Sequence, residues 1–139
     1  MNFLLDTNLV SEWTKPRPNP GVVAWLAEVD EDRTFLSAIT FMELRYGINR
    51  LPAGKRRQQL DEWATRVLPL RFENRILAID ALTSDICGQI MANSESMGRR
   101  MDFADAFLAA TAQLHGLTVV TRNLTDFEPV LNTLFSPWI

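Results

Sequence analysis

The sequence predicts an α/β protein in which a mainly parallel β-sheet is covered by helices on both faces. Three short apolar runs have the length of buried strands, namely Phe3–Leu5, Thr34–Ala38 and Leu117–Thr121. Longer segments with apolar residues at helical spacing separate these runs. Strands that alternate with helices pair in parallel and place the helices on the two faces of the sheet.

Length and composition indicate one soluble globular domain over residues 1–139. A typical domain has roughly 150 residues, and this chain has 139, of which 47% are apolar and 22% are charged. The net charge of −3 excludes a protein that binds nucleic acid through bulk positive charge alone. The single cysteine, Cys87, cannot form an internal disulfide, and Asp6 interrupts the apolar run at the N-terminus. Without a signal peptide or an apolar stretch of about 18 residues, we expect a cytoplasmic protein with no membrane span.

Capping signals mark the helices in the first half of the chain. Asn19 is followed by proline, which predicts a helix with proline at its first position. Thr40 and Glu43 have the spacing of a capping box, which predicts a helix that begins at Thr40 and carries Glu43 in its first turn. This helix should end near Asn49, and a further helix is expected over Lys55–Leu68.

The second half of the chain continues the alternation. Arg75–Ile79 is either a short strand or the entry to the helix expected over Asp80–Met97. Another helix is expected over Asp102–His115, and Gly116 supplies its stop signal. Val130–Phe135 has the composition of an edge strand.

Acidic and amide side chains gather at one edge of the predicted sheet. The candidates are Asp6, Glu43, Asp102, Asp105, Asn123 and Asp126. Asp6 follows the first strand directly, and Glu43 lies five residues past the second. Asp102 and Asp105 are three residues apart and share a helix face. Because ligands bind beyond the carboxyl ends of parallel strands, this edge is the predicted site.

This cluster of carboxylates predicts a site for a hard divalent cation. Neighbouring carboxylates raise one another's pKa, and a bound cation relieves the repulsion. Oxygen ligands without cysteine or histidine suit Mg²⁺ or Mn²⁺ rather than zinc. Such an ion can activate a water molecule and stabilise the leaving oxygen of a phosphodiester. The chain has one histidine, His115, in the last turn of a predicted helix, so a catalytic histidine is not expected.

Each acid also has a purely structural explanation. Asp6 could only cap the helix that follows it, and Glu43 could serve only the capping box. Asp102 and Asp105 could complement the dipole of their helix, and Asp126 could begin a turn. The convergence of all five at one predicted edge favours the metal site.

Four segments of the chain resemble the PIN-domain ribonucleases. They are LLDTN at 4–8, SAITFMELRYG at 37–47, DAFLAATAQLHGLTVVTRN at 105–123 and DF at 126–127. The D-A-x-x-A-A-T-A segment before the TVVTRN run is the most specific. With a closing Ser-Pro-Trp element at 136–138, the resemblance covers essentially the whole chain. Within this family, the sequence resembles the VapC/FitB-type toxins of prokaryotic toxin–antitoxin pairs.

The resemblance implies a three-layer α/β/α sandwich and a Mg²⁺-dependent endoribonuclease, with Mn²⁺ as the alternative ion. Asp6, Glu43 and Asp105 match the family's catalytic acids, and Asp6 and Asp105 would bind the metal. Two candidates remain open for the fourth acid. Asp126 belongs to a TRN-x-x-DF form of the motif, whereas Asn123 stands where many relatives have aspartate.

Neighbouring residues are assigned accessory roles by the same resemblance. Thr7 and Asn8 match the family's DTN motif and would orient Asp6 or a metal-bound water molecule. Asp102 matches no acid expected in the family, so it is assigned to the surroundings of the site or to the surface.

Basic residues near the acids are candidates for contacts with RNA phosphates. Arg99, Arg100 and Arg122 flank the proposed site acids. The basic run Lys55–Arg57 lies at the start of a helix, where the helix dipole disfavours positive charge. It is interpreted as a solvated surface, with a contact to the RNA backbone as the alternative. Once the candidate site acids are set aside, basic residues outnumber the remaining acidic ones. The acidic net charge therefore does not exclude an RNA substrate.

The family resemblance also implies partners. It implies a homodimer, neutralisation by a cognate antitoxin, and contact with DNA only through that antitoxin. The rival interpretation is a non-catalytic Mg²⁺-binding α/β module, either receiver-like or a degenerate PIN domain. A receiver-like domain should have paired acids after its first strand and a lysine after a late strand, whereas this chain has only Asp6 and then Thr-Arg-Asn at 121–123.

Overall fold

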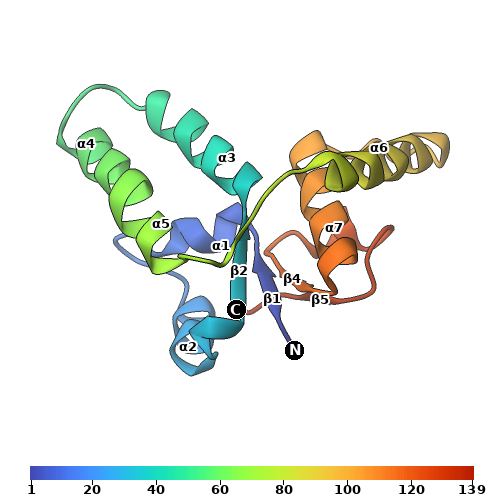
Figure 1. Cartoon of the computed structure of the whole chain (residues 1–139). Helices are drawn as coiled ribbons and strands as arrows, with labels where there is room; N and C mark the ends of the chain where they lie inside the picture. Colours follow the sequence, from blue (N-terminus) through green and yellow to red (C-terminus); the bar gives the residue numbers. More distant parts are fainter.

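The computed structural model describes residues 1–139, and a five-stranded parallel sheet lies at its centre (Figure 1). The strands lie in the order β3-β2-β1-β4-β5. Each strand pairs in parallel with its neighbour. The strands are β1 (Phe3–Leu5), β2 (Thr34–Ser37), β3 (Ile76–Leu77), β4 (Thr118–Val120) and β5 (Leu134–Phe135).

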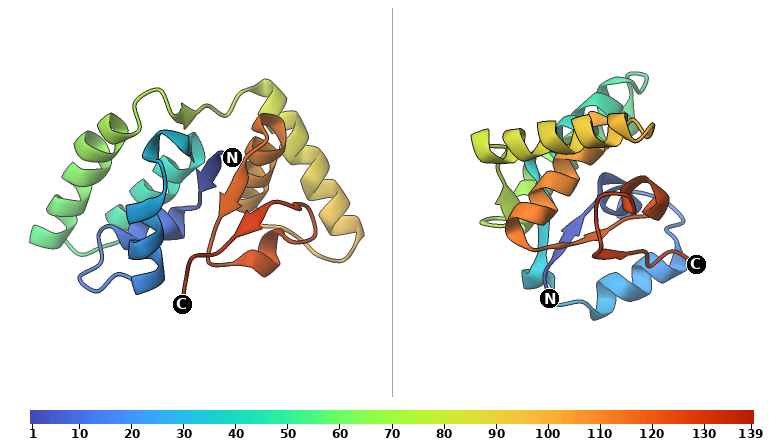
Figure 2. Two further views of the ribbon diagram at one scale, coloured as in Figure 1. Left: turned by 90° about the horizontal axis from the view of Figure 1, so that it is seen from below. Right: turned by 90° about the vertical axis from the view of Figure 1, so that its right-hand side faces the viewer.

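Helices cover both faces of this sheet, as predicted for a three-layer α/β/α sandwich. Figures 1 and 2 show α3, α4 and α5 on one side of the sheet and α6 and α7 on the other. None of the helices is long and apolar enough to cross a lipid bilayer. The helices are α1 (Thr7–Glu12), α2 (Pro20–Glu28), α3 (Ala38–Asn49), α4 (Lys55–Glu62), α5 (Leu68–Arg71), α6 (Ala81–Ser96), α7 (Phe103–His115) and α8 (Leu124–Phe127).

The order of the strands creates a topological switch point between β1 and β4. From β1 the chain adds β2 and β3 on one side, and it then returns to add β4 and β5 on the other. Open α/β sheets bind their ligands at such a point, beyond the carboxyl ends of the strands. Receiver-like domains have the strand order 2-1-3-4-5, so this sheet does not fit the receiver-like alternative.

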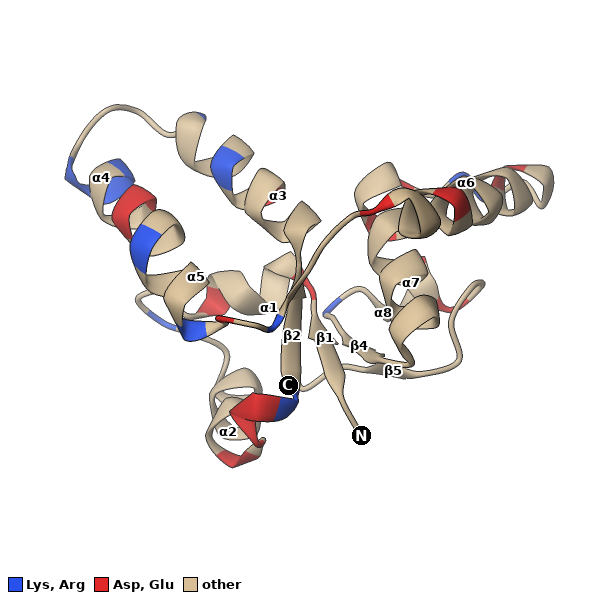
Figure 3. Cartoon of the chain, viewed as in Figure 1, with Lys and Arg blue, Asp and Glu red and all other residues tan.

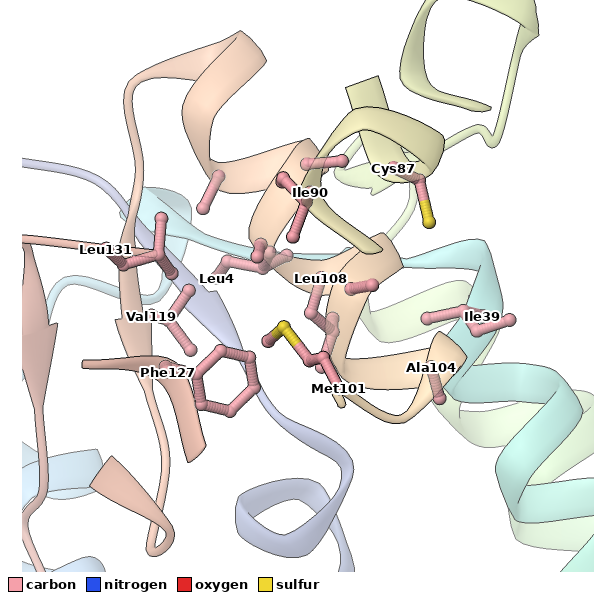
Figure 4. Close-up of a cluster of buried hydrophobic side chains, with 14 of the residues drawn as sticks. Leu4, Ile39, Cys87, Ile90, Met101, Ala104, Leu108, Val119, Phe127 and Leu131 are labelled. Atoms are coloured by element: carbon pink, nitrogen blue, oxygen red, sulfur yellow. The ribbon is translucent and has the colours of Figure 1, made fainter. Parts of the chain in front are cut away.

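Successive residues of the central strands point to opposite faces of the sheet and build two cores. Leu4 pairs in register with Val119 and packs with α6 and α7, whereas Leu5 pairs with Val120 and packs with α1, α2 and α3. Figure 4 shows the first core, in which Val119 lies close to Phe127. Full burial of each such side chain stabilises the fold by roughly 1.5–3 kcal/mol. The two cores fix the ends of β1 and β4 and hence the position of the predicted site.

Small side chains let α7 lie close to the sheet. Ala106, Ala109 and Ala110 are fully buried in the first core. The helix begins after Asp102 and ends at Gly116, which adopts the left-handed conformation with φ 66°. The close approach of α7 brings its first turn, with Asp105, to the carboxyl end of the central strands.

The start of α3 differs from the prediction. Ser37, the last residue of β2, caps the helix, because its hydroxyl accepts a hydrogen bond from the N–H of Ile39 at 3.1 Å. The helix therefore begins at Ala38, and Thr40 and Glu43 lie within it rather than forming a capping box. Thr40 is fully buried, and its hydroxyl contacts Thr7 instead of the helix start.

The predicted helix over Lys55–Leu68 extends to Arg71 and is not regular. A π-helical segment, Trp63–Val67, joins α4 to α5. Pro69 accounts for the irregularity, because it has no N–H to donate to the carbonyl of Thr65 and its ring would clash there. The edge strand expected over Val130–Phe135 is shorter, since only β5 pairs with the sheet.

The chain end packs against the start of α2. The side chain of Asn19 caps this helix, accepting from the N–H of Gly21 at 3.0 Å, and its amide donates to the carbonyl of Ile139 at 2.9 Å. A Cβ atom on Gly21 would lie 2.1 Å from the carbonyl oxygen of Pro137. Glycine is thus required where the closing element crosses the helix.

Candidate active site

Asp6 lies at the switch point, at the carboxyl end of β1 and the N-cap of α1. Its side chain accepts from the N–H of Thr7 at 2.7 Å, from the hydroxyl of Thr121 at 2.7 Å and from the amide of Asn8 at 3.2 Å. Only 6% of the residue is exposed. Burial raises the pKa of the Asp6 carboxyl, the hydrogen bonds oppose that rise, and the charge of Asp126 adds to it. Asp6 is thus a helix cap and, at the same time, a buried acid at the predicted site.

Thr121 connects the two strands across the switch point and was not identified from the sequence. It follows β4 directly and is fully buried. Besides donating to Asp6, its hydroxyl accepts from the N–H of Asn123 at 3.0 Å. The sequence signal that could have identified Thr121 is a hydroxyl residue in the TRN motif, directly after the most strand-like run. Thr121 orients the Asp6 carboxylate from the opposite side of the switch point.

Glu43 reaches the site from α3 through a short hydrogen bond. The hydroxyl of Thr7 donates to Oε1 of Glu43 at 2.6 Å. Burial raises the pKa of the Glu43 carboxyl, the bond from Thr7 opposes the rise, and the charges of Asp6 and Asp102 add to it. The capping explanation no longer applies to Glu43, because the carboxylate is directed toward α1.

Asp105 is the most strongly perturbed acid of the chain. It lies in the first turn of α7, is partly buried and accepts no hydrogen bond from another side chain. Burial raises its pKa to about 7, and the charges of Asp6, Asp102, Asp126 and Glu43 add to the effect. The repulsion from these four carboxylates shows that β1, α3, the start of α7 and α8 bring their acids together.

Asp126 and Asn123 occupy different positions relative to the other acids. Asp126 lies in α8, and its charge raises the pKa of both Asp6 and Asp105. Asn123 precedes α8, and its side chain makes no capping bond to that helix. Asp102 is the N-cap of α7 without a side-chain cap bond, and it raises the pKa of Glu43 and Asp105. Asp102 therefore lies in the surroundings of the site, which is the first of the two positions that the sequence allowed for it.

A polar cavity of about 270 Å³ adjoins these acids. Asp102, Asp105 and Asp126 lie in its wall, together with Arg99 and Arg100. Arg122 does not line this cavity, and its backbone N–H donates to the side chain of Asn8 at 3.4 Å. The structure thus places two of the three candidate arginines beside the acids.

The basic run Lys55–Arg57 lies away from this cavity, on α4. Figure 3 shows basic residues along α3 and α4, on the side of the sheet opposite α6 and α7. Arg56 donates to the carbonyl oxygen of Thr14 at 2.6 Å, whereas Lys55 is exposed. The run therefore combines a structural contact with solvated surface.

The donor set fits a hard divalent cation that keeps most of its water. No group of three or more His, Cys, Asp or Glu side chains is arranged to enclose a metal ion. Mg²⁺ needs no such enclosure, since proteins commonly bind it through one or two carboxylates together with water and substrate phosphates. Asp6 and Asp105 could hold it, since burial first, and neighbouring acids second, raise the pKa of both carboxyls, and a bound cation would favour their charged forms.

The chain belongs to the PIN-domain family, and the resemblance of its motifs to this family is confirmed. The model of the PIN domain matches residues 3–128. The chain is 42% identical to Toxin FitB of Neisseria gonorrhoeae over 137 residues, which cover 98% of both proteins. It is 38% identical over 137 residues to VapC ribonuclease Y4jK of Sinorhizobium fredii, covering 98% of this chain and 97% of the relative. The structure of FitAB bound to an IR36 DNA fragment superposes with a TM-score of 0.90 at 38% identity, covering 99% of this chain and 96% of the solved one.

Proposed function

We propose that this protein is a Mg²⁺-dependent endoribonuclease and the toxin of a toxin–antitoxin pair. The observation that carries the proposal is the crowding of Asp6, Glu43 and Asp105, from three separate elements, at the switch point of the sheet. Partly buried acids that repel one another are typical of metal-assisted active sites. Relatives named as a toxin and as a ribonuclease support the same activity.

The side chains have distinct roles in this proposal. When bound, Mg²⁺ polarises the scissile phosphate, lowers the pKa of a water molecule and stabilises the leaving oxygen. Asp6 and Asp105 hold the ion, and the bonds from Thr121 and Asn8 keep Asp6 in position. Glu43, fixed by Thr7, accepts a hydrogen bond from a water molecule and orients it toward the phosphate.

The partners of the protein follow from the same relatives. Because a FitAB complex has been solved on a DNA fragment, we propose that a cognate antitoxin neutralises this toxin and that the toxin meets DNA only through that antitoxin. We propose that the toxin is cytoplasmic and forms a homodimer. Arg99 and Arg100 are the proposed contacts for RNA phosphates, because they lie beside the acids.

The direct test is cleavage of a mixed-sequence RNA pool by purified protein in Mg²⁺, in Mn²⁺ and in EDTA. Wild-type protein should cleave only with a divalent ion, and Asp6→Asn and Asp105→Asn should abolish cleavage. Asp85→Asn, which removes an exposed carboxylate from α6, is the matched control and should cleave normally. Metal binding without cleavage in the wild type would support the non-catalytic PIN domain instead.

A further inference from the structure

We infer that the polar cavity beside the acids is a subsite for one nucleotide, the one directly next to the scissile phosphate of the RNA strand. The cavity lies between the end of α6, the loop that joins α6 to α7, and the segment after α8. The proposed function defines the polymer as RNA, and this inference rests on it.

The two arginines on the cavity wall are free to bind a phosphate. Arg99 and Arg100 are exposed, and neither forms a salt bridge with any acid of the chain. The one side-chain hydrogen bond of Arg99 is a long one, 3.4 Å, to the carbonyl of Thr125. Guanidinium groups match the geometry of phosphate oxygens. A phosphate bound by these arginines would lie in the same cavity that Asp105 and Asp126 line, as a neighbour of the scissile phosphate would.

A buried hydroxyl without a partner lies in the same wall. Ser94 of α6 is 2% exposed, and its Oγ has no hydrogen-bond partner. Serine within a helix can satisfy its hydroxyl by bonding a carbonyl one turn earlier, which Ser94 does not do. Buried polar groups are nearly always paired, and an exception is typical of a functional position. Ser94 can donate to or accept from the edge of a base that enters the cavity.

The remaining wall is apolar, and the volume is nearly that of a small-ligand pocket. Met101, Pro129 and Val130 line the cavity beside Ser94. A hydrated cation gains no binding energy from an apolar surface, whereas the face of a base can pack against it. The cavity of about 270 Å³ is close to the lower end of small-ligand pockets, roughly 300–1,000 Å³. Phosphate contacts, apolar contact and one hydrogen-bonding group together define a site for a base, a ribose and a phosphate.

The test is a titration of isotope-labelled full-length protein with adenosine and uridine 5′-monophosphate in Mg²⁺, followed by NMR. Amide signals of the residues lining the cavity should shift, with a dissociation constant of about 1 mM for so small a ligand. The Arg99→Ala/Arg100→Ala variant should bind both nucleotides about tenfold more weakly, a loss of ~1.4 kcal/mol. The charge-matched control Lys55→Ala/Arg66→Ala changes residues on the α4 side, and it should bind like the wild type.

A second variant separates base recognition from phosphate binding. Ser94→Ala should weaken the binding of the nucleotide whose base bonds the hydroxyl, with inorganic phosphate binding unchanged. Its melting temperature should stay the same or rise, because the substitution removes an unpaired buried hydroxyl. Ser96→Ala, two residues along α6, is the control, since that hydroxyl already donates to the carbonyl of Asn93 at 2.8 Å.

The outcomes separate this inference from the proposed function. Shifts confined to other surfaces, or inorganic phosphate that binds as well as the nucleotides with Ser94→Ala unaffected, would overturn the subsite. Neither result depends on cleavage, since a mononucleotide has no internucleotide bond. If the protein cleaves RNA but binds no nucleotide in this cavity, the proposed function stands and the subsite is refuted. If the protein binds the nucleotides in this cavity but cleaves no RNA, the cavity is a nucleotide site and the nuclease activity is refuted.

Discussion

Asp105→Asn should make the metal-free protein more stable, and the gain should appear only above the ordinary pKa of an aspartate. In the folded protein the pKa of Asp105 is about 7, against an ordinary value of 3.8. The folded state therefore holds a proton between these two pH values that the unfolded state releases. Stability falls as the pH rises through this window, because the folded state binds more protons than the unfolded state. Asparagine removes this loss, since it carries no charge for burial to penalise or for the other acids to repel.

The magnitude follows from the difference of about three pKa units at ~1.36 kcal/mol per unit. That product is an upper limit, because Asp105 is only partly buried and solvent screens its repulsion. We expect the variant to be more stable than the wild type by about 1–3 kcal/mol at pH 8, with no gain at pH 4. The stability lost when Asp6 ionises is smaller, because its carboxylate accepts three hydrogen bonds that stabilise the charge.

Urea unfolding in EDTA at a series of pH values between 4 and 8 measures this difference. Asp85→Asn is the control, and its stability should follow that of the wild type within about 0.5 kcal/mol at every pH. Mg²⁺ added at pH 8 should stabilise the wild type more than Asp105→Asn, because the ion binds the folded carboxylates. A variant no more stable than the wild type at pH 8 would refute the argument that burial and neighbouring acids disfavour the charged form of Asp105.

Three further substitutions test individual side chains of the site. Glu43→Gln should lower RNA cleavage at least tenfold, about 1.4 kcal/mol of barrier, with near-normal melting, and a fully active variant would remove Glu43 from the site. In metal titrations, Asn123→Asp should tighten Mg²⁺ binding and Asp126→Asn should weaken it. If neither variant changes the affinity, neither side chain contributes to binding the ion. Thr121→Val should lower stability at pH 7 by about 1–3 kcal/mol in urea unfolding, since it leaves the buried Asp6 carboxylate without one donor; unchanged stability would contradict the importance of this bond.

The local elements of the fold could be predicted because their signals lie within a few residues. Asn19 before a proline, Asp80 before the long helix and Gly116 after α7 each act on the backbone of their own helix end. The alternation of strands and helices then limits the sheet to parallel pairing. The prediction of a capping box at Thr40 was wrong because Ser37, three residues earlier, ends β2 and caps the helix.

The gathering of acids at one edge was also predictable, because it follows from the rule for parallel sheets. Asp6 stands directly after β1, and Asp105 opens the helix before β4, so the topology alone places both near the carboxyl ends of the strands. The catalytic and metal-binding roles of these acids and of Glu43 remain predictions.

The sequence alone therefore determined the class of fold and the edge of the sheet at which the candidate site acids gather. Tertiary structure decided how these acids are held. The bond from Thr7 to Glu43 spans 36 residues and the bond from Thr121 to Asp6 spans 115. The effect of the Asp102 charge on the pKa of its neighbours depends on how α3, α6 and α7 pack, and so does the cavity beside Ser94. No local pattern encodes these contacts, because their geometry is set by the two cores that fix the helices against the sheet.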